Sequence, residues 1–559
     1  MKTYKTIFTI CTAIVLFSGC ADFLEEKPNA ILNEEEVQDP DKMLNAVYSS
    51  LGNDHYDVPF SLWPYGTVRS DDAYKGGSGE QDIQVFHFFE TSSNITTDFS
   101  EVDKLWFQCY IAVSRANSAL KILHSLDSDY PAKEERIAEA RFLRGHFYFM
   151  LKILFKNIPY IDETVPVEDY GTISNVALNN DELWQKIADD FQYGVEHLPP
   201  SQVEKGRADK YAAAAYLAKT YLYKAYRQGD KNSVTEINAA DLQKTIQNTE
   251  LVIASSYRLE DDFAFNFLPG DYENGVESLF AVQFSKDDGT KFGRVNFSDL
   301  LSVPMKLGCC DFLKPSQSLV NAFRTQNGLP MFDDYNNADY SASDKADPRL
   351  FHTVAIPGLP YKYNTALIYE EDWNRNPATY SVYASLKENV DPECDCFVPM
   401  VPFYANTKNR ILIRYADVLL MRAEALIESG RFADALPLIN QIRNRAKVST
   451  GLIGFAGNTE IQPYTDGVNC TWNQDFARKA LRWERRLELA MEGGRFFDLV
   501  RWGISEQTMN EYYDVEQNRR YYYSGAFFVK NKHEYLPVPE QQIKFSKYLY
   551  KQNPGYGEN

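Results

Sequence analysis

Apolar residues recur at steps of three and four along several long segments of the chain, the spacing that places them on one face of an α-helix. The pattern predicts helices over residues 106–126, 134–155 and 208–230, and a further helix that begins at Asp181, a suitable N-cap. Gly229 is a natural stop for the helix that ends there. Alanine and tyrosine recur at helical spacing in this segment, so we interpret the stripe as a packing surface and not as a cofactor site.

Residues 411–446 predict two helices around the turn sequence ESGRF. Small residues alternate with large ones on both sides of the turn, at Ala423, Ala425, Ala433 and Ala435. This pattern is typical of a tetratricopeptide unit. Such a pair cannot cover its own apolar face, so it has to stack on similar pairs or on another layer. The predicted fold is therefore mostly α, with tetratricopeptide-like helical pairs forming a scaffold.

Regular periodicity fades over residues 263–403, which are rich in Gly, Pro, Asn, Asp and Tyr. A loop region of this length inside a compact protein is usually functional or disordered. Its many aromatic residues argue against disorder. We expect a large irregular, loop-rich portion with few short strands, one of them in the run VESLFAVQFS.

The N-terminus reads as a secretion signal. Lys2 and Lys5 precede an apolar run at residues 7–17, too short for the roughly 20 residues of a membrane-spanning helix. Small residues then lead to Cys20, the pattern of a bacterial lipoprotein signal, so we predict that residues 1–19 are removed and Cys20 is lipidated. Several acyl chains would hold the protein at a membrane. The alternative is an ordinary signal peptide that is cut nearby and leaves Cys20 as a free thiol.

Composition fits a globular body behind this anchor. The 559 residues are 44% hydrophobic and 24% charged, with no second long apolar segment, which predicts a large water-soluble core. The net charge of −20 argues against binding to nucleic acid or to anionic lipid. Aromatic residues reach 14%, a weak indication of a surface that stacks on a ligand.

We expect a single globular domain over residues 41–559, joined to the anchor by a tether at residues 20–40. Its helical scaffold would occupy about 41–260 and 404–559. The loop-rich ligand-binding portion would lie between them, at about 261–403.

The cysteines give little guidance. Without Cys11 and Cys20, the remaining residues allow 15 disulfide connectivities: Cys109, Cys309, Cys310, Cys394, Cys396 and Cys470. Cys309–Cys310 and Cys394–Cys396 could be cross-linked in an oxidising compartment. A zinc site would need wider spacing or nearby histidine, and His352 stands alone. The oxygen-rich segment 333–339 fits an exposed acidic turn better than a calcium loop, so we expect no metal or cofactor.

Several motifs then recur in a specific order along the chain. They are CADFLEEKP after the signal, LWFQCYIAVSRANSAL, EARFLRGHFYFMLKILF with NIPYIDE, RYADVLLMRAEALIESG, LINQIRNRA, ALRWERRLELAMEGGRFFDLVRWG and EYLPVPEQQI. Through them the chain resembles, nearly end to end, the SusD/RagB family of outer-membrane lipoproteins from Bacteroidetes.

This resemblance implies a mostly α-helical protein, lipid-anchored at the outer membrane, that captures oligo- or polysaccharide at the cell surface without cutting it. It also implies delivery of the glycan to a partner, a SusC-like TonB-dependent transporter. The acidic residues Asp22, Glu25 and Glu26 after Cys20 resemble the signal that sends such lipoproteins to the outer face.

The Glu- and Arg-rich motif around residues 484–501 could be mistaken for catalytic acid–base pairs. We interpret it instead as structural ion pairs between packed elements, because it belongs to the scaffold that the resemblance implies.

A glycan site needs flat aromatic rings for the apolar faces of sugars and planar polar groups for their hydroxyls. Two loops, at residues 63–82 and 361–375, combine these features, and the segment FGRVN is a weaker third candidate. Trp63 also fits a buried position, and Asp72 also fits a turn cap. The predicted ligand-binding residues are Trp63, Tyr65, Arg69, Asp72, Tyr74, Arg294, Asn296, Tyr361, Trp373, Asn374 and Arg375.

Two other function classes remain. A glycoside hydrolase needs two facing carboxylates, roughly 5–10 Å apart, whereas the adjacent Asp71 and Asp72 would point apart. A tetratricopeptide-type protein–protein scaffold without its own glycan site is the stronger alternative. For a glycan ligand, the net charge predicts a neutral or weakly charged one, unless Arg69, Lys75, Arg294 or Arg375 forms a local positive patch.

Overall fold

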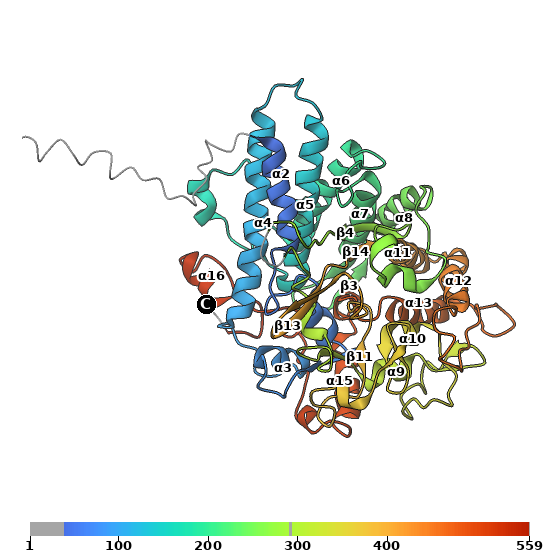
Figure 1. Cartoon of the computed structure of the whole chain (residues 1–559). Coiled ribbons are helices and arrows are strands. Elements are labelled where there is room, and N and C mark those ends of the chain that lie inside the picture. Colours follow the sequence, from blue (N-terminus) through green and yellow to red (C-terminus); the bar gives the residue numbers. More distant parts are fainter. Residues whose placement is uncertain (1–38, 290–292, 558–559) are drawn as a thin grey trace, which may run out of the picture.

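The structure of the protein is a computed structural model that describes residues 39–289 and 293–557 (Figure 1). The expected signal peptide, Cys20 and nearly all of the tether lie outside the described residues. Within the described ranges, none of the helices combines the length and the apolar character needed to cross a bilayer. The chain is 44% helix and 11% strand, which confirms the mostly α fold.

Long helices pack side by side in sequence order (Figure 1). The first group is α2 (Pro40–Ser49), α4 (Ser100–Ser125), α5 (Lys133–Phe155), α6 (Asn180–His197), α7 (Lys210–Ala225) and α8 (Ala239–Ile253). The second group is α11 (Tyr415–Glu428), α12 (Phe432–Val448) and α13 (Gln474–Glu488). Helices α4 to α8 each contact the next, and α8 packs on α11, which contacts both α12 and α13. The two predicted helical blocks thus form one continuous layer.

Several predicted helix ends differ from the structure. Helix α6 begins at Asn180, because the side chain of Asn179 accepts from the backbone of Asp181 and Glu182 and completes a capping box. Helix α7 ends at Ala225, before the predicted stop at Gly229. The intervening residues instead form a short strand that pairs with residues after the turn.

Shorter helices connect this layer to the rest of the molecule. They are α3 (Gln84–Glu90), α9 (Gln317–Ala322), α10 (Arg349–Thr353), α14 (Arg495–Arg501), α15 (Ser505–Glu516) and α16 (Glu540–Phe545). Single helical turns include η3 (Trp63–Val68), η8 (Glu371–Trp373) and η9 (Tyr521–Tyr523).

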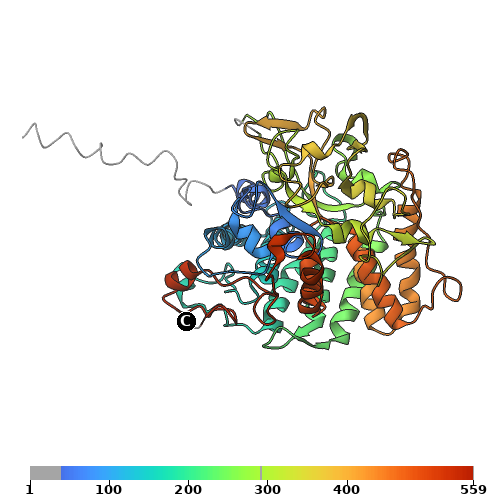
Figure 2. The same ribbon diagram turned by 90° about the horizontal axis from the view of Figure 1, so that it is seen from below.

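The strands are short, and in the described chain they form only two-stranded sheets. They are β1 (Ala73–Gly76), β2 (Tyr226–Gln228), β3 (Val234–Ile237), β4 (Ser278–Val282), β5 (Phe312–Pro315), β6 (Thr325–Gln326), β7 (Leu329–Pro330), β8 (Val354–Ala355), β9 (Pro360–Tyr361), β10 (Asn364–Ile368), β11 (Ala384–Ser385), β12 (Phe397–Met400), β13 (Phe403–Asn406) and β14 (Arg410–Arg414). The antiparallel pairs are β1–β5, β2–β3, β4–β14, β6–β7, β8–β11, β9–β10 and β12–β13. Strand β4 lies in the run VESLFAVQFS, as predicted. Much of the loop-rich portion lies on one side of the helices (Figure 2).

A buried ionic network joins the scaffold to the loop-rich portion. The Arg414 guanidinium donates to Glu488 at 2.6 Å and to Glu277 at 2.7 Å, and Arg445 donates to Glu277 at 2.9 Å. Burial raises the pKa of Glu488, but Arg445, Arg414 and Arg349 outweigh it and hold that pKa well below its ordinary value. The Glu- and Arg-rich motif is therefore structural, as the sequence predicted.

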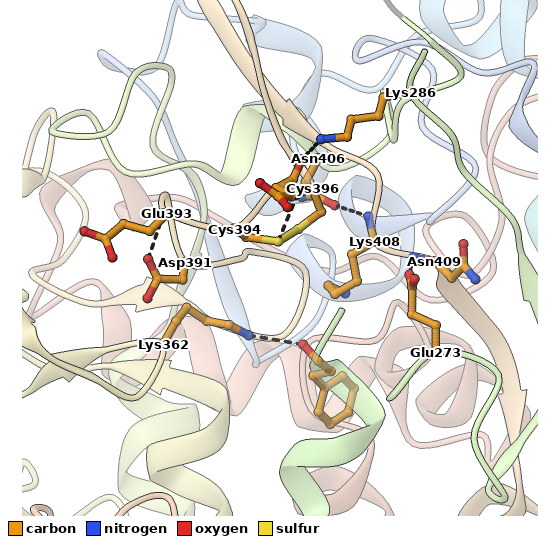
Figure 3. The surroundings of a disulfide bond; sticks show 12 residues. Glu273, Lys286, Lys362, Asp391, Glu393, Cys394, Cys396, Asn406, Lys408 and Asn409 are labelled. Carbon is orange, nitrogen blue, oxygen red and sulfur yellow. Dashed lines mark hydrogen bonds between the residues drawn. A yellow bond between two sulfur atoms is a disulfide. The ribbon is translucent and has the colours of Figure 1, made fainter. Parts of the chain in front are cut away.

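The loop-rich portion contains the disulfides Cys309–Cys310 and Cys394–Cys396, whereas Cys109 and Cys470 are free. Figure 3 shows the Cys394–Cys396 bridge in the turn before β12, where the Lys286 ammonium donates to the backbone carbonyl of Asp395. The backbone N–H of Thr407 donates to the Cys396 carbonyl at 2.9 Å. This hydrogen bond closes the base of the β12–β13 hairpin, and the bridge lies just before β12.

Candidate functional site

The predicted aromatic residues of the first loop lie in the interior. Trp63 donates its indole N–H to the Ser298 carbonyl at 3.0 Å and packs edge-on against Phe86. Tyr65 and Tyr74 are fully buried, and the Tyr74 hydroxyl donates to Glu516 at 2.7 Å. The expectation that these rings face solvent is wrong, because η3 and β1 pass through the core. None of the three offers a ring face for a polymer to stack on.

The polar residues predicted in the same loop also form contacts inside the folded protein. Arg69 is 2% exposed, donates to the His533 carbonyl at 2.6 Å and lies over the Phe496 ring. Asp72 accepts from Arg486 at 2.8 Å in a buried ion pair. Both groups position segments distant in sequence and are not turned toward solvent.

The predicted residues of the second loop mostly form a small buried cluster. Tyr361 and Trp373 pack together with Tyr369, with ring centroids 5.3–6.1 Å apart. The Asn374 side chain accepts from the Tyr369 hydroxyl at 2.8 Å and from the buried Lys314 ammonium. The sequence cannot separate such a loop core from a ligand platform, because both consist of aromatic and amide side chains.

The third candidate segment is divided between interior and surface. Asn296 is 2% exposed and donates to Asp299 at 2.8 Å. Arg294 is half-buried and donates to the Ser49 carbonyl at the end of α2. Trp63 and Asn296 both line an interior cavity of about 180 Å³ between α5, α7 and the loop-rich portion. That volume lies below the roughly 300–1,000 Å³ of typical ligand sites, so it is too small for an oligosaccharide.

The two predicted loops nevertheless meet at the surface. The Arg375 guanidinium donates to Asp82 at 3.0 Å, and the Asn376 amide donates to the Ser78 carbonyl at 3.0 Å. We call this surface the loop junction and define it by Ser78, Glu80, Asp82, Arg375, Asn376 and Tyr521. Its polar groups are oriented by one another across the gap between the loops.

The backbone of residues 77–82 makes the loop junction possible. Gly77 has φ +79°, which favours glycine, and a Cβ there would meet the Phe312 ring at 2.6 Å. The Ser78 N–H and hydroxyl both donate to the Asp82 carboxylate. Below the loop, Lys75 is buried and donates to the Gly79 and Asp82 carbonyls, and burial lowers the pKa of this lysine to about 8.

The exposed aromatic residue of the loop junction comes from the C-terminal part of the chain. Tyr521 in η9 is 69% exposed, whereas its neighbours Tyr522 and Tyr523 are buried. Glu80 of the first loop raises the pKa of Tyr521, so the phenol lies near that loop. Sequence reasoning missed this residue, although the run RRYYYSG was a usable signal of tyrosine beyond core needs.

Chemically, the loop junction offers one open ring face with carboxylate, amide and guanidinium groups around it. These groups can both donate hydrogen bonds to a polyhydroxylated ligand and accept from it. The described residues contain no cluster of His, Cys, Asp or Glu that could hold a metal ion.

A positive patch from Arg69, Lys75, Arg294 and Arg375 does not form. Arg69 and Lys75 are buried, Arg294 is bonded to α2, and Arg375 is paired with Asp82. Glu371 and Asp372 are exposed just before Arg375 in the chain, so negative charge predominates there.

The fold is that of a helical-repeat protein with a loop-rich portion on one side of the helices. Two family models match the chain: one described as "SusD family" over residues 276–556, and one described as "Starch-binding associating with outer membrane" over residues 22–222. The chain belongs to the SusD family.

Several relatives match over most of their length. SusD-like protein P2 of Formosa agariphila is 26% identical over 580 residues, which cover 100% of both chains. A SusD-like carbohydrate-binding protein of Bacteroides fragilis has a solved structure that superimposes with a TM-score of 0.70 at 21% identity, over 93% of this chain and 98% of that one. A laminarin-binding SusD-like protein superimposes with a TM-score of 0.65 at 22% identity, over 92% and 99%. These structures share the fold of the chain.

Proposed function

We propose that the protein captures oligo- or polysaccharide at the cell surface and that the loop junction contacts the glycan. The observation that carries this proposal is the exposed ring of Tyr521 near Glu80 of the first loop, a loop that meets the second one through Arg375 and Asn376. Stacking on the ring and hydrogen bonds to the planar groups match the two kinds of surface that a sugar presents. Carbohydrate binding by the Bacteroides fragilis protein and laminarin binding by a second structural neighbour support it.

The protein would act without catalysis. A hydrolase needs two accessible carboxylates that face each other across the sugar. Asp71 is buried and paired with Arg486 and Arg495, and Asp72 is buried beside it. Neither group is placed to act on a polymer.

We further propose that lipid on Cys20 anchors the protein at the outer membrane, where it passes glycan to a SusC-like TonB-dependent transporter. The family model that is named for association with the outer membrane supports the location. The transporter partner rests on the family resemblance of the chain. A protein–protein scaffold without a glycan site remains the competing function, and its helical layer would provide the contact surface.

The expected ligand is neutral or weakly charged. The net charge of −20 and the exposed carboxylates near Arg375 both disfavour polyanions, and the site lacks the positive patch that could reverse this. Tighter binding to a polyuronate or a sulfated chain than to any neutral polysaccharide would contradict this assignment.

Affinity gel electrophoresis tests the proposed function. The chain without residues 1–20, which keeps every described residue, is run through gels that contain laminarin, soluble starch or other neutral plant and algal polysaccharides. We expect at least one neutral polymer to retard it. Retardation by none of them, together with capture of a transporter from outer-membrane extracts, would favour the scaffold function instead.

A further inference from the structure

A second group of accessible rings shares no residue with the loop junction. His55, Tyr56, Phe297 and Phe403 come from three separate segments and form a row, which we call the hairpin row. Ring centroids are 6.2 Å apart for Phe297 and His55, 4.0 Å for His55 and Tyr56, and 5.2 Å for Tyr56 and Phe403. His55 is exposed and the other three are half-buried, so each keeps part of its surface open to solvent.

The hairpin row is held in place by its surroundings. The His55 imidazole pairs with Asp57 at 2.5 Å, and the Lys104 ammonium of α4 donates to the same carboxylate at 3.0 Å. Phe403 belongs to the β12–β13 hairpin, which directly follows the Cys394–Cys396 disulfide in the chain (Figure 3). Rings fixed in this way lose little conformational entropy when they bind a ligand.

A groove adjoins the row. It has a volume of about 640 Å³, runs between α2 and Phe297, and falls in the size range of ligand sites. Its walls carry planar polar side chains together with charged ones: Asn45, Asn53, Arg207, Gln283 and Arg294, and Asp54, Glu204, Lys205 and Asp288. Amides and guanidinium groups beside flat rings suit a neutral polyhydroxylated ligand better than an apolar peptide segment.

We propose that the hairpin row and its groove form a second carbohydrate-binding surface, separate from the loop junction. It shares with the proposed function only the premise that the ligand is a glycan. Two surfaces on one rigid body would bind one long polysaccharide at two points, and the second contact becomes intramolecular once the first has formed. The protein should therefore hold long polymers more tightly than short oligosaccharides of the same sugar.

Variants at each surface test this proposal. Their binding is measured with a polysaccharide that retards the unaltered protein in affinity gels, and laminarin and soluble starch are tried first. Tyr56→Ala combined with Phe403→Ala should weaken binding of the polymer by about 10-fold, and so should Tyr521→Ala alone. The triple variant should lose binding, whereas Phe545→Ala, at a ring 76% exposed on α16, should change nothing. Thermal unfolding checks that each variant is folded.

Hydrogen exchange on the unaltered protein keeps the test independent of folding defects. The saturating polymer should protect the backbone amides of residues 53–58 and 397–404 as well as those of 77–82 and 519–525. Protection of the loop junction alone, or full affinity of the Tyr56→Ala/Phe403→Ala variant, would overturn this inference and leave the proposed function standing. Protection of the hairpin row alone would support the inference and contradict the loop junction. Binding to no polysaccharide would overturn both.

Discussion

Arginine–carboxylate pairs serve opposite purposes in two regions of the molecule. In the ionic network, the side chains of Arg414 and Glu488 are 1% and 0% exposed, and they join the scaffold to the loop-rich portion. At the loop junction, the side chains of Arg375 and Asp82 are 33% and 25% exposed, and solvent or a ligand can reach them. The same chemistry stabilises the fold in one place and stays accessible to solvent in the other. Burial, and not residue type, decides which.

The sharpest test of this contrast removes the central arginine of the buried network. Arg414→Met leaves Glu277, Glu488 and Glu492 with fewer partners in the interior, so we expect the free energy of unfolding to fall by about 5 kcal/mol. Arg375→Met is the matched control, and it should cost less than about 1 kcal/mol because its pair is exposed. Urea unfolding monitored by circular dichroism measures both. Equal losses would contradict the distinction.

Trp373→Ala separates packing from ligand contact in the second loop. Trp373 is 4% exposed and packs against Tyr361 and Tyr369, so truncation should cost about 3 to 5 kcal/mol of stability. Glycan affinity, measured where the variant remains folded, should stay close to that of the unaltered protein. Lost affinity with unchanged stability would instead make Trp373 a ligand contact, as the sequence first suggested.

The buried network also predicts how stability depends on pH. The pKa of Glu488 is lower in the folded protein than its value of about 4.3 in the unfolded chain. The ionised Glu488 carboxylate therefore stabilises the fold fully above about pH 4.3, and this stabilisation is lost as the pH falls from there toward the folded pKa. Unfolding free energies measured from pH 6 to pH 3 should therefore decline, and they should decline less steeply in Arg414→Met. If the stability of Arg414→Met fell with pH as steeply as that of the unaltered protein, the ionic network would not be the cause of the pH dependence.

The helices could be predicted because their signal is local. Periodicity over residues 134–155 or 411–446 needs no knowledge of distant contacts, and its errors were confined to ends such as Ala225, where a strand pairs with residues beyond the turn. Strand β14, at the start of the second block, was missed for a related reason, since its partner β4 lies far away in the sequence. The division of the chain into tether, scaffold and ligand-binding portion stays a prediction.

The site could be predicted only in part, because exposure is set by long-range packing. The sequence found both loops of the junction, and their contact, between Arg375 and Asp82, spans 293 positions. It could not show that Trp63 and Trp373 turn inward. Nor could it show that, of three successive tyrosines, only Tyr521 faces solvent, because that depends on how η9 meets the loop at Glu80.

The central claim is that one exposed tyrosine at the loop junction holds the glycan, and titration calorimetry of Tyr521→Ala tests it most directly. With a neutral polysaccharide that the unaltered protein binds, the variant should lose at least about 10-fold in affinity, roughly 1.4 kcal/mol, with its stability unchanged because the ring is exposed. Tyr548→Ala, at a ring 62% exposed near α16, should bind as the unaltered protein does. Equal affinities for Tyr521→Ala and Tyr548→Ala would contradict the account.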